Sequence, residues 1–384
     1  MKIAVIHSIY KPFIRGGAEV VVQNIVEGLK ALGHDVFVIS VGYENICEEI
    51  DGIKVYRVKP FNLFNFLDIN AQPVWKRLLW HPLDMFNDFQ TWRIFKILNK
   101  EKPALALTHS LKGLGYEIPL LLKEMKIKNI HTIHDMQLIH PSGLLAEDEK
   151  LSWLANSYAA LCRLLFGSPA AVVYPSEYIK QIYSRHGFFK KSKAAVLGNP
   201  LPASSKIGII KAEADKFIMA YVGQIESYKG VVDLVKIING LPGDWELLIA
   251  GEGSALREVT KWSLDNNKIK ILGRLDAIGL EQKIWSKADL LINPSKVAES
   301  FGMVVIEAFA HGMPVLASKI GALQDLVRER ETGWLFKPGD QLDLKRSIEF
   351  IMSNRDQLKS MRGKCLEEAK KFKLDNYLSK LLEL

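Results

Sequence analysis

Two glutamates, Glu299 and Glu307, lie on either side of a Ser-Phe-Gly turn, and their carboxylates could bind the hydroxyl groups of a ligand. The turn follows an apolar run and precedes the helical pattern VVIEAFAHG, so we expect a helix to begin near Gly302. Its free N–H groups and positive dipole end would then point into a loop that already carries a carboxylate. A helical path between the two glutamates spans at most roughly 12 Å. The spacing therefore suits a nucleotide sugar, although a carboxylate that only stabilises the helix start explains it equally well.

Two further turns suit an anionic ligand. Gly16-Gly17, after Arg15, would let backbone amides approach a phosphate, and Lys229 places an ammonium before a helix start at Gly230. Neither turn matches the GxGxxG or Walker pattern. A plain helix-entry turn and a solvated surface lysine are the alternatives.

A third candidate is the run Ile130-His-Thr-Ile-His-Asp135, which carries His131 and His134 out of a strand. Three metal ligands with supporting partners are not evident, so the alternative to a ligand-binding role is a buried histidine bonded to a carbonyl. No isolated Asp-x-Asp stands at the end of a predicted strand, Glu147-Asp-Glu149 falls in a polar loop, and we expect no metal site.

The elements that must position these residues alternate between strand and helix patterns, which predicts parallel, doubly wound sheets. After the Pro- and Gly-rich stretch 198–215 the pattern restarts, so we expect an α/β protein with two Rossmann-like domains facing a cleft. The predicted domains are 1–200, 201–365 and a C-terminal helix, 366–384, crossing back to the first domain. The predicted strands are 2–9, 34–40, 53–58, 104–108, 130–133, 171–174, 194–197, 216–223, 245–251, 269–275 and 288–294, and the main helices are 18–32 and 231–240 and those beginning near residues 255, 281 and 302.

Composition limits the classes of function. The 384 residues are 48% hydrophobic and 24% charged, and the net charge of +8 is concentrated in residues 1–200. Lys and Arg do not interleave with aromatics as in nucleic-acid binders, and we expect no nucleic acid partner. Three scattered cysteines fit a reducing cytoplasm, and no apolar run predicts a signal peptide or a membrane span. The aromatic segment 61–99 is best explained by two packed helices; the alternative is an interfacial patch on an anionic membrane.

Several motifs occur in one order along the chain and resemble a single family. They are GGAE, THS, HTIHD, YPSEYI, GNPLP, YVGQIESYKG, IAGEGS, ILGRLD, ESFGMVVIEAFAHGMPVLAS and GWLFKPGD. Together they look like a retaining, nucleotide-sugar-dependent glycosyltransferase of family 4, with the GT-B architecture, and the resemblance covers nearly the whole chain. The Glu299 and Glu307 pair fits the E-x7-E element of that family.

The resemblance implies roles for individual residues. It implies that Glu299 contacts the donor sugar, Glu307 the ribose and Lys229 the diphosphate, while His134 lies beside the sugar ring. His134, Glu299 and Lys229 are thus the expected catalytic residues. The remaining expected donor-binding residues are Gly16, Gly17, Gly223, Gln224, Arg274, Leu275, Phe301, Gly302 and Met303.

One residue departs from the family pattern. Gln224 stands where family members commonly have arginine, so leaving-group stabilisation would depend more on Lys229, with Arg15 or Arg274 as candidate replacements. The expected function is metal-independent, cofactor-free transfer of a sugar to a sugar or lipid-linked acceptor, in polysaccharide or glycolipid synthesis. A nucleotide-sugar epimerase and a catalytically silent nucleotide-sugar-binding partner protein are the alternatives.

Overall fold

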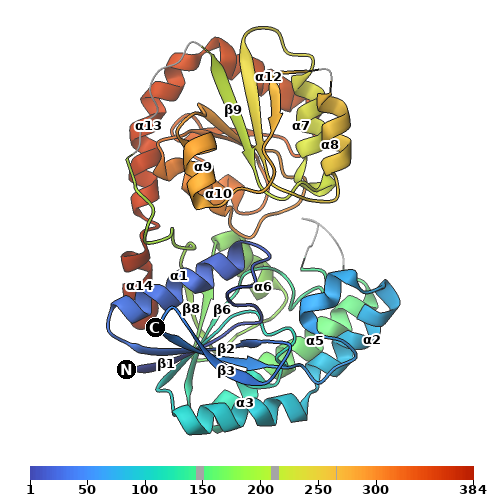
Figure 1. The fold of residues 1–384 in the computed structure, drawn as a ribbon, viewed down its shortest axis with the longest axis vertical. Coiled ribbons are helices and arrows are strands. Elements are labelled where there is room, and N and C mark those ends of the chain that lie inside the picture. The colour runs from blue at the N-terminus through green and yellow to red at the C-terminus, as the bar shows by residue number, and fades with distance from the viewer. Residues whose placement is uncertain (144–150, 209–215, 265) are drawn as a thin grey trace. The chain divides into compact units, whose positions relative to one another are not determined.

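The computed structural model describes residues 1–143, 151–208, 216–264 and 266–384. Its contacts divide the chain into two compact units. The first contains the described residues of 1–203 together with Leu374–Leu384, and the second contains those of Ser204–Lys373. Each unit is a sheet covered by helices, so the expected fold class of two Rossmann-like α/β domains is confirmed (Figure 1).

The first sheet has eight strands in the order β3-β4-β2-β1-β5-β6-β7-β8. All pairs are parallel except β3 with β4. The central strand β1 (Lys2–Ile6) is fully apolar after its first residue and buried, as expected for a strand covered on both faces. The others are β2 (Asp35–Val41), β3 (Ile46–Ile50), β4 (Ile53–Val58), β5 (Leu105–Thr108), β6 (Lys128–Thr132), β7 (Ala171–Tyr174) and β8 (Lys193–Val196).

Strand β3 is the one element of this sheet that the sequence did not predict. Its sequence, ICEEI, is mostly exposed and pairs antiparallel with β4 at the sheet edge. Because neither face is buried, the strand lacks the hydrophobic signal on which sequence patterns depend. The charged residues there also discourage pairing with another chain.

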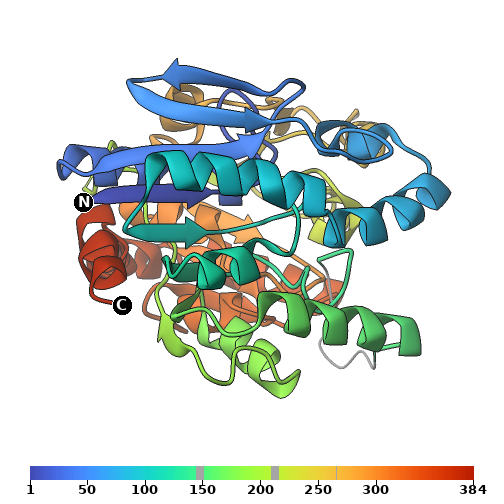
Figure 2. The ribbon, with the colours of Figure 1, turned by 90° about the horizontal axis from the view of Figure 1, so that it is seen from below.

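Helices cover the first sheet. Helix α1 (Gly17–Ala31) follows β1, and the C-terminal helix α14 (Leu374–Leu382) packs beside it (Figure 1). Gly28 on α1 permits this approach, since a Cβ there would lie 2.6 Å from Leu378. Both chain termini lie at the same edge of this unit (Figure 2). The remaining helices are α2 (Val74–Met85), α3 (Asp88–Glu101), α4 (Ile118–Glu124), α5 (Trp153–Phe166) and α6 (Glu177–Arg185), with the 3-10 turn η1 (Phe66–Ala71).

The aromatic segment 61–99 forms η1, α2 and most of α3, which confirms the expected pair of helices. Trp80 is fully buried, stacks on Phe64 and Phe66, and donates its indole N–H to the Phe64 carbonyl. Much of the segment is nevertheless at the surface, with Trp75 61% and Trp92 49% exposed. Packing against the sheet therefore explains only part of the aromatic content.

The second sheet has six parallel strands in the order β11-β10-β9-β12-β13-β14. These are β9 (Phe217–Val222), β10 (Trp245–Ala250), β11 (Ile269–Ile271), β12 (Leu290–Asn293), β13 (Val315–Ser318) and β14 (Gly333–Phe336). Its helices are α7 (Val231–Ile238), α8 (Leu256–Ser263), α9 (Ala277–Leu280), α10 (Met303–Ala310), α11 (Leu323–Leu326), α12 (Gln341–Ser353) and α13 (Arg355–Lys370), with the 3-10 turn η2 (Ser227–Lys229) and the π-helical turn η3 (Glu281–Trp285). None of the helices in the described parts of the chain combines the length and the apolar composition that a membrane span requires.

Candidate functional site

The strand order of the second sheet reverses at β9, whose neighbours are β10 on one side and β12 on the other. In open α/β sheets a ligand crevice forms at such a point, outside the carboxyl ends of the strands. The loops that leave β9 and β12 there carry Gly223, Gln224 and Lys229 and the stretch from Glu299 to Met303. The topology thus brings together residues about seventy positions apart in sequence.

Lys229 and Glu299 are in direct contact at this point. The Lys229 ammonium donates to Glu299 Oε1 at 2.7 Å, and the two side chains are 24% and 13% exposed. Gly230 positions the lysine, because its φ of +74° is left-handed and a Cβ there would lie 1.9 Å from the carbonyl oxygen of Pro294. Only glycine allows the two loops to approach this closely. An ammonium and a carboxylate held at one edge can serve a phosphate and a sugar hydroxyl, respectively.

Helix α10 begins where the spacing predicts, with Gly302 as its N-cap. Gly302 has a φ of +111°, and a Cβ there would lie 2.9 Å from Leu323. Phe301 is 3% exposed and packs edge-on against Phe372, so only its backbone is available to a ligand. Met303 opens the helix, and burial raises the pKa of the Glu307 carboxyl one turn further on. The helix start therefore offers amides and a dipole end near Glu299 in sequence.

The loops after β9, β10 and β11 are joined by backbone hydrogen bonds. Gly223 donates to Ala250, and Gly251 donates to Gly273 at 2.8 Å. A Cβ on Gly251 would lie 1.8 Å from the Gly223 carbonyl, so these loops also require glycine. Gln224, Arg274 and Leu275 follow along the same edge, and the side chains of Gln224 and Arg274 are exposed. Tyr228 donates its hydroxyl to Gln224 Oε1 at 3.3 Å, which orients this amide.

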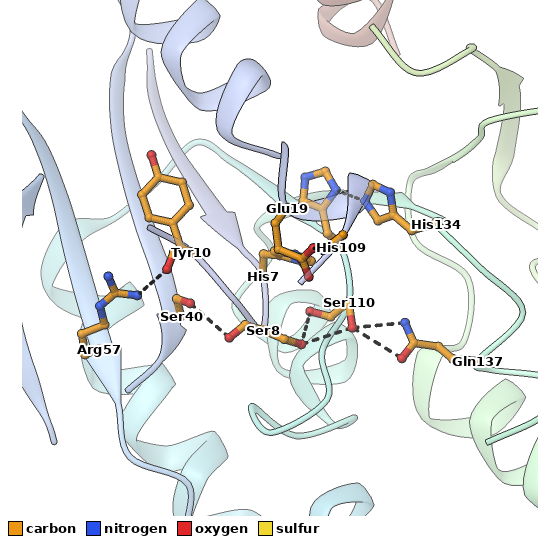
Figure 3. Close-up of polar contacts among 11 residues, drawn as sticks. His7, Ser8, Tyr10, Glu19, Ser40, Arg57, His109, Ser110, His134 and Gln137 are labelled. Carbon is orange, nitrogen blue, oxygen red and sulfur yellow. Dashed lines mark hydrogen bonds and ion pairs between the residues drawn. The ribbon is translucent and has the colours of Figure 1, made fainter. Parts of the chain in front are cut away.

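The predicted residues Gly16, Gly17 and His134 belong to the first unit. The first sheet changes direction at β1, between β2 and β5, and His7 and His109 directly follow β1 and β5. His109 Nδ1 lies 2.9 Å from His134 Nε2, so one ring donates to the other (Figure 3). Burial lowers the pKa of His134 to about 4, and both rings are therefore neutral near pH 7.

His131, the alternative to His134, has a structural role. It is 3% exposed, hydrogen-bonds Thr108 Oγ1 at 3.0 Å and packs edge-on against Phe166. His134 instead is partly exposed and lines an open pocket of the first unit. The position of His134 favours it over His131 as the histidine available to a ligand.

The glycine turn opens α1 beside the same pocket, which Arg15, Ala18 and Glu19 help to line. Gly16 is extended, and its N–H donates to Glu19 Oε2 at 2.7 Å, so the glutamate caps the helix. A phosphate at this turn would meet the amides that follow Gly16. Arg15 donates to the carbonyls of Phe66 and Leu67, so one nitrogen of its guanidinium is already hydrogen-bonded within the protein.

Sequence reasoning missed several polar residues of the first unit. Ser8, Ser110 and Gln137 form a hydrogen-bonded chain beside the histidines (Figure 3). His7 is 1% exposed; its ring makes no hydrogen bond within the described parts of the chain, and its Nε2 lies 3.9 Å from Glu19 Oε1. The available signal was a polar residue directly after a strand, as in the run His7-Ser8 after β1. The acids 147–149 lie outside the described residues.

Two family models match the chain. Glycosyltransferase Family 4 covers residues 15–204, and Glycosyl transferases group 1 covers residues 205–372. An uncharacterized glycosyltransferase of Methanocaldococcus jannaschii is 26% identical over 379 residues, which cover 92% of this chain and 90% of the relative.

Solved structures of glycosyltransferases share the fold. Sucrose-phosphate synthase from Thermosynechococcus elongatus matches with a TM-score of 0.78 at 19% identity, covering 100% of this chain and 97% of that one. The Anabaena protein HepE, in complex with UDP-glucose, matches with a TM-score of 0.73 at 18% identity, covering 100% and 98% of the two chains.

Proposed function

Since the chain belongs to glycosyltransferase family 4 and is a glycosyltransferase with the GT-B fold, we propose that it uses a nucleotide-diphosphate sugar as its donor. The transfer retains the anomeric configuration, needs no metal ion, and delivers the sugar to a sugar or lipid-linked acceptor in polysaccharide or glycolipid synthesis. The observation that carries the proposal is the Lys229–Glu299 pair at the switch point of the second sheet. The UDP-glucose held by HepE, a protein of the same fold, supports this donor class.

The proposed chemistry separates two charges. Cleavage of the bond between sugar and diphosphate leaves positive charge on the ring carbon and negative charge on the phosphate. Lys229 and the amides at the start of α10 stabilise the phosphate, while Glu299 accepts hydrogen bonds from sugar hydroxyls. Glu307 contacts the ribose, and Gln224 contributes a neutral hydrogen bond.

Retention is proposed through a front-side transfer. The leaving phosphate accepts the proton of the acceptor hydroxyl, and the neutral His134 ring orients the sugar. Neutrality matters because a protonated imidazole would repel the developing positive charge on the ring carbon. Analysis of the product anomer tests this step, and an inverted product would contradict it.

Metal independence is proposed because Lys229 and the amides at the start of α10 would stabilise the negative charge of the diphosphate, which a metal ion would otherwise do. Within the described residues, no group of three or more His, Cys, Asp or Glu side chains is arranged to hold a metal ion. The test is transfer from radiolabelled donor sugar in the presence of a chelator. Undiminished transfer is expected, and complete loss that magnesium restores would overturn metal independence.

A membrane contact is proposed for the first domain, on the cytoplasmic face. The outer aromatic surface consists of exposed side chains of α2, α3 and the residues before them, with cations among them. Lys96 lies 3.4 Å above the Trp92 ring, and Arg93 lies 4.3 Å from the Phe89 ring. Apolar rings beside cations suit an interface of anionic lipid. The exposed side chains of this surface are Phe61, Leu63, Val74, Trp75, Leu78, Leu79, Leu83, Phe86, Phe89, Trp92 and Phe95.

Vesicle sedimentation tests this contact. The chain should bind phosphatidylcholine vesicles containing phosphatidylglycerol more than pure phosphatidylcholine vesicles, and the Trp75→Gln and Trp92→Gln double variant should bind less. Trp262→Gln is the matched control, because Trp262 is 45% exposed in the second unit and also lies beneath a lysine. Equal loss in this control would contradict a specific surface.

A further inference from the structure

An open pocket of about 710 Å³ lies in the first unit and includes His134, the residue proposed to orient the donor sugar. It extends from His7, Glu19 and His134, at the carboxyl ends of the strands, to helix α2. It also includes Lys112, from the loop after β5. A ligand bound here would reach from the proposed reaction centre of this domain to the outer aromatic surface.

Helix α2 presents three different faces. Trp80, Asp84 and Met85 are buried against the unit. Val74, Arg77, Leu78 and His81, which recur at the spacing of one helix face, line the pocket. Trp75, Leu79 and Leu83 form a separate stripe and are 61%, 56% and 47% exposed. The pocket is therefore bordered by polar groups inside and by apolar side chains at its mouth and beyond.

Arg77 carries an unpaired charge. Its Nε is buried without a hydrogen-bond partner, and no ion pair of its guanidinium occurs among the described residues. A guanidinium stays charged at any physiological pH, so a buried donor of this kind is satisfied only by a ligand or water. Its planar donor fork matches the oxygens of a phosphate.

His81 and Lys112 are two further polar side chains near Arg77. Burial, together with the charges of Lys112 and Arg77, lowers the pKa of His81 to about 4, so both cations lie near a neutral imidazole. Lys112 donates to the carbonyl of Pro141 at 2.9 Å and keeps further donors.

The acids around the pocket are already used by the protein. Glu19 accepts from the Gly16 amide, and Asp135 accepts from the Gln137 amide at 2.8 Å. Asp84, beneath the pocket wall, accepts twice from the Gly113 amide. Burial raises the pKa of each of these carboxyl groups, and a carboxyl group that is more often protonated repels a bound anion less.

We propose that this pocket binds the phosphate group of an amphiphilic acceptor, through Arg77, His81 and Lys112, with the apolar stripe of α2 against its hydrocarbon chain. This inference rests on the proposed function and names its acceptor class. A lipid phosphate satisfies both the unpaired guanidinium and the exposed stripe, whereas a soluble sugar satisfies neither.

Calorimetric titration of the full chain with dodecyl phosphate, below its micellar concentration, tests the inference. Inorganic phosphate and octaethylene glycol monododecyl ether, which has the same chain and an uncharged head, are the comparison ligands. Dodecyl phosphate should bind at least tenfold more tightly than either. Equal binding of inorganic phosphate would indicate a soluble phosphate ligand, and equal binding of the ether would indicate detergent adsorption; either result overturns the proposal.

Variants locate the binding. Arg77→Gln should weaken dodecyl phosphate binding tenfold or more, and Arg77→Lys should weaken it less because the charge remains. Leu79→Gln should weaken binding of dodecyl phosphate but not of inorganic phosphate. The matched control is Arg185→Gln, at the exposed end of α6, which should change nothing. Unchanged binding by folded Arg77→Gln and Arg77→Lys would overturn the proposal.

Thermal stabilisation of the unaltered chain by nucleotide sugars tests the proposed donor independently of the proposed acceptor. If no nucleotide sugar stabilises the chain, the proposed function fails. If one does and dodecyl phosphate does not bind, the acceptor inference alone fails.

Discussion

The ammonium of Lys229 and the carboxylate of Glu299 hold each other in place at 2.7 Å, partly shielded from solvent. A pair that is only part-buried costs little to open, since water still reaches both groups. A donor diphosphate would therefore replace the carboxylate as the partner of the lysine. The glutamate would then be free to accept hydrogen bonds from the sugar.

Replacing Lys229 with alanine tests this arrangement. Lys229→Ala should lower kcat/KM for transfer by about 10²–10³, because one preorganised positive group at a developing phosphate charge is worth about 3–4 kcal/mol. Steady-state kinetics with varied donor measures the change. Lys236→Ala, which breaks an exposed pair with Glu258 on the same domain, should leave kcat/KM unchanged. Similar losses in both variants would argue against a specific role.

The histidine pair predicts the form of the pH profile. Because burial lowers the pKa of His134 to about 4, the ring is neutral at all higher pH values. The profile of kcat/KM between about pH 5.5 and 8 should therefore show no ionisation that disappears in His134→Gln. An ionisation near the ordinary histidine value that the substitution removes would contradict a neutral His134.

At the scale of elements, the alternating pattern predicted the parallel strands and the start of α10, because burial on both faces and a glycine N-cap leave strong local signals. The pattern did not predict the features that depend on tertiary contacts. Strand β1 was expected to reach Ile9 but ends at Ile6, since the amide of Ser8 bonds to Ser110 across the switch point. The switch-point neighbours His7 and His109 are about one hundred residues apart, so no local pattern could have joined them.

The start of α10 supports a prediction on glycine. Gly302→Ala should lower the free energy of unfolding by about 1–2 kcal/mol, because it combines a left-handed φ of +111° with a Cβ 2.9 Å from Leu323. Gly363→Ala, inside α13 with open space around it, should be neutral or stabilising. Denaturant unfolding measures both, and equal stability of the two variants would contradict this account of the helix start.

The last described helix of the chain packs into the first unit. Leu374, Tyr377, Leu378 and Leu381 of α14 are buried, and the helix lies along α1. The chain thus begins and ends in one unit, with the second unit formed by the residues between. Sequence patterns predicted the amphipathic helix, but its partner depends on Gly28, whose role is visible only in three dimensions.

Buried Asp84 makes overall stability depend on pH. Burial raises the pKa of its carboxyl group from 3.8 to about 7, so the folded state holds the proton more tightly than the unfolded state. The stabilisation is complete below about pH 4 and is lost as pH rises through about 7. Between pH 5 and 8 the native chain should lose about 2–3 kcal/mol of unfolding free energy more than Asp84→Asn does. Parallel pH dependences in denaturant unfolding would show that Asp84 is not responsible.

Binding of a nucleotide sugar at the edge around Lys229 and Glu299 can be measured by thermal unfolding with a panel of nucleotide sugars in chelator. A ligand at one hundred times its Kd adds about 2.7 kcal/mol to the stability of a folded protein. At least one nucleotide sugar should raise the midpoint of the native chain and of Lys236→Ala, and should raise it much less in Lys229→Ala and Glu299→Gln. No shift with any nucleotide sugar, or the same shift in all four proteins, would show that this edge does not bind a nucleotide sugar.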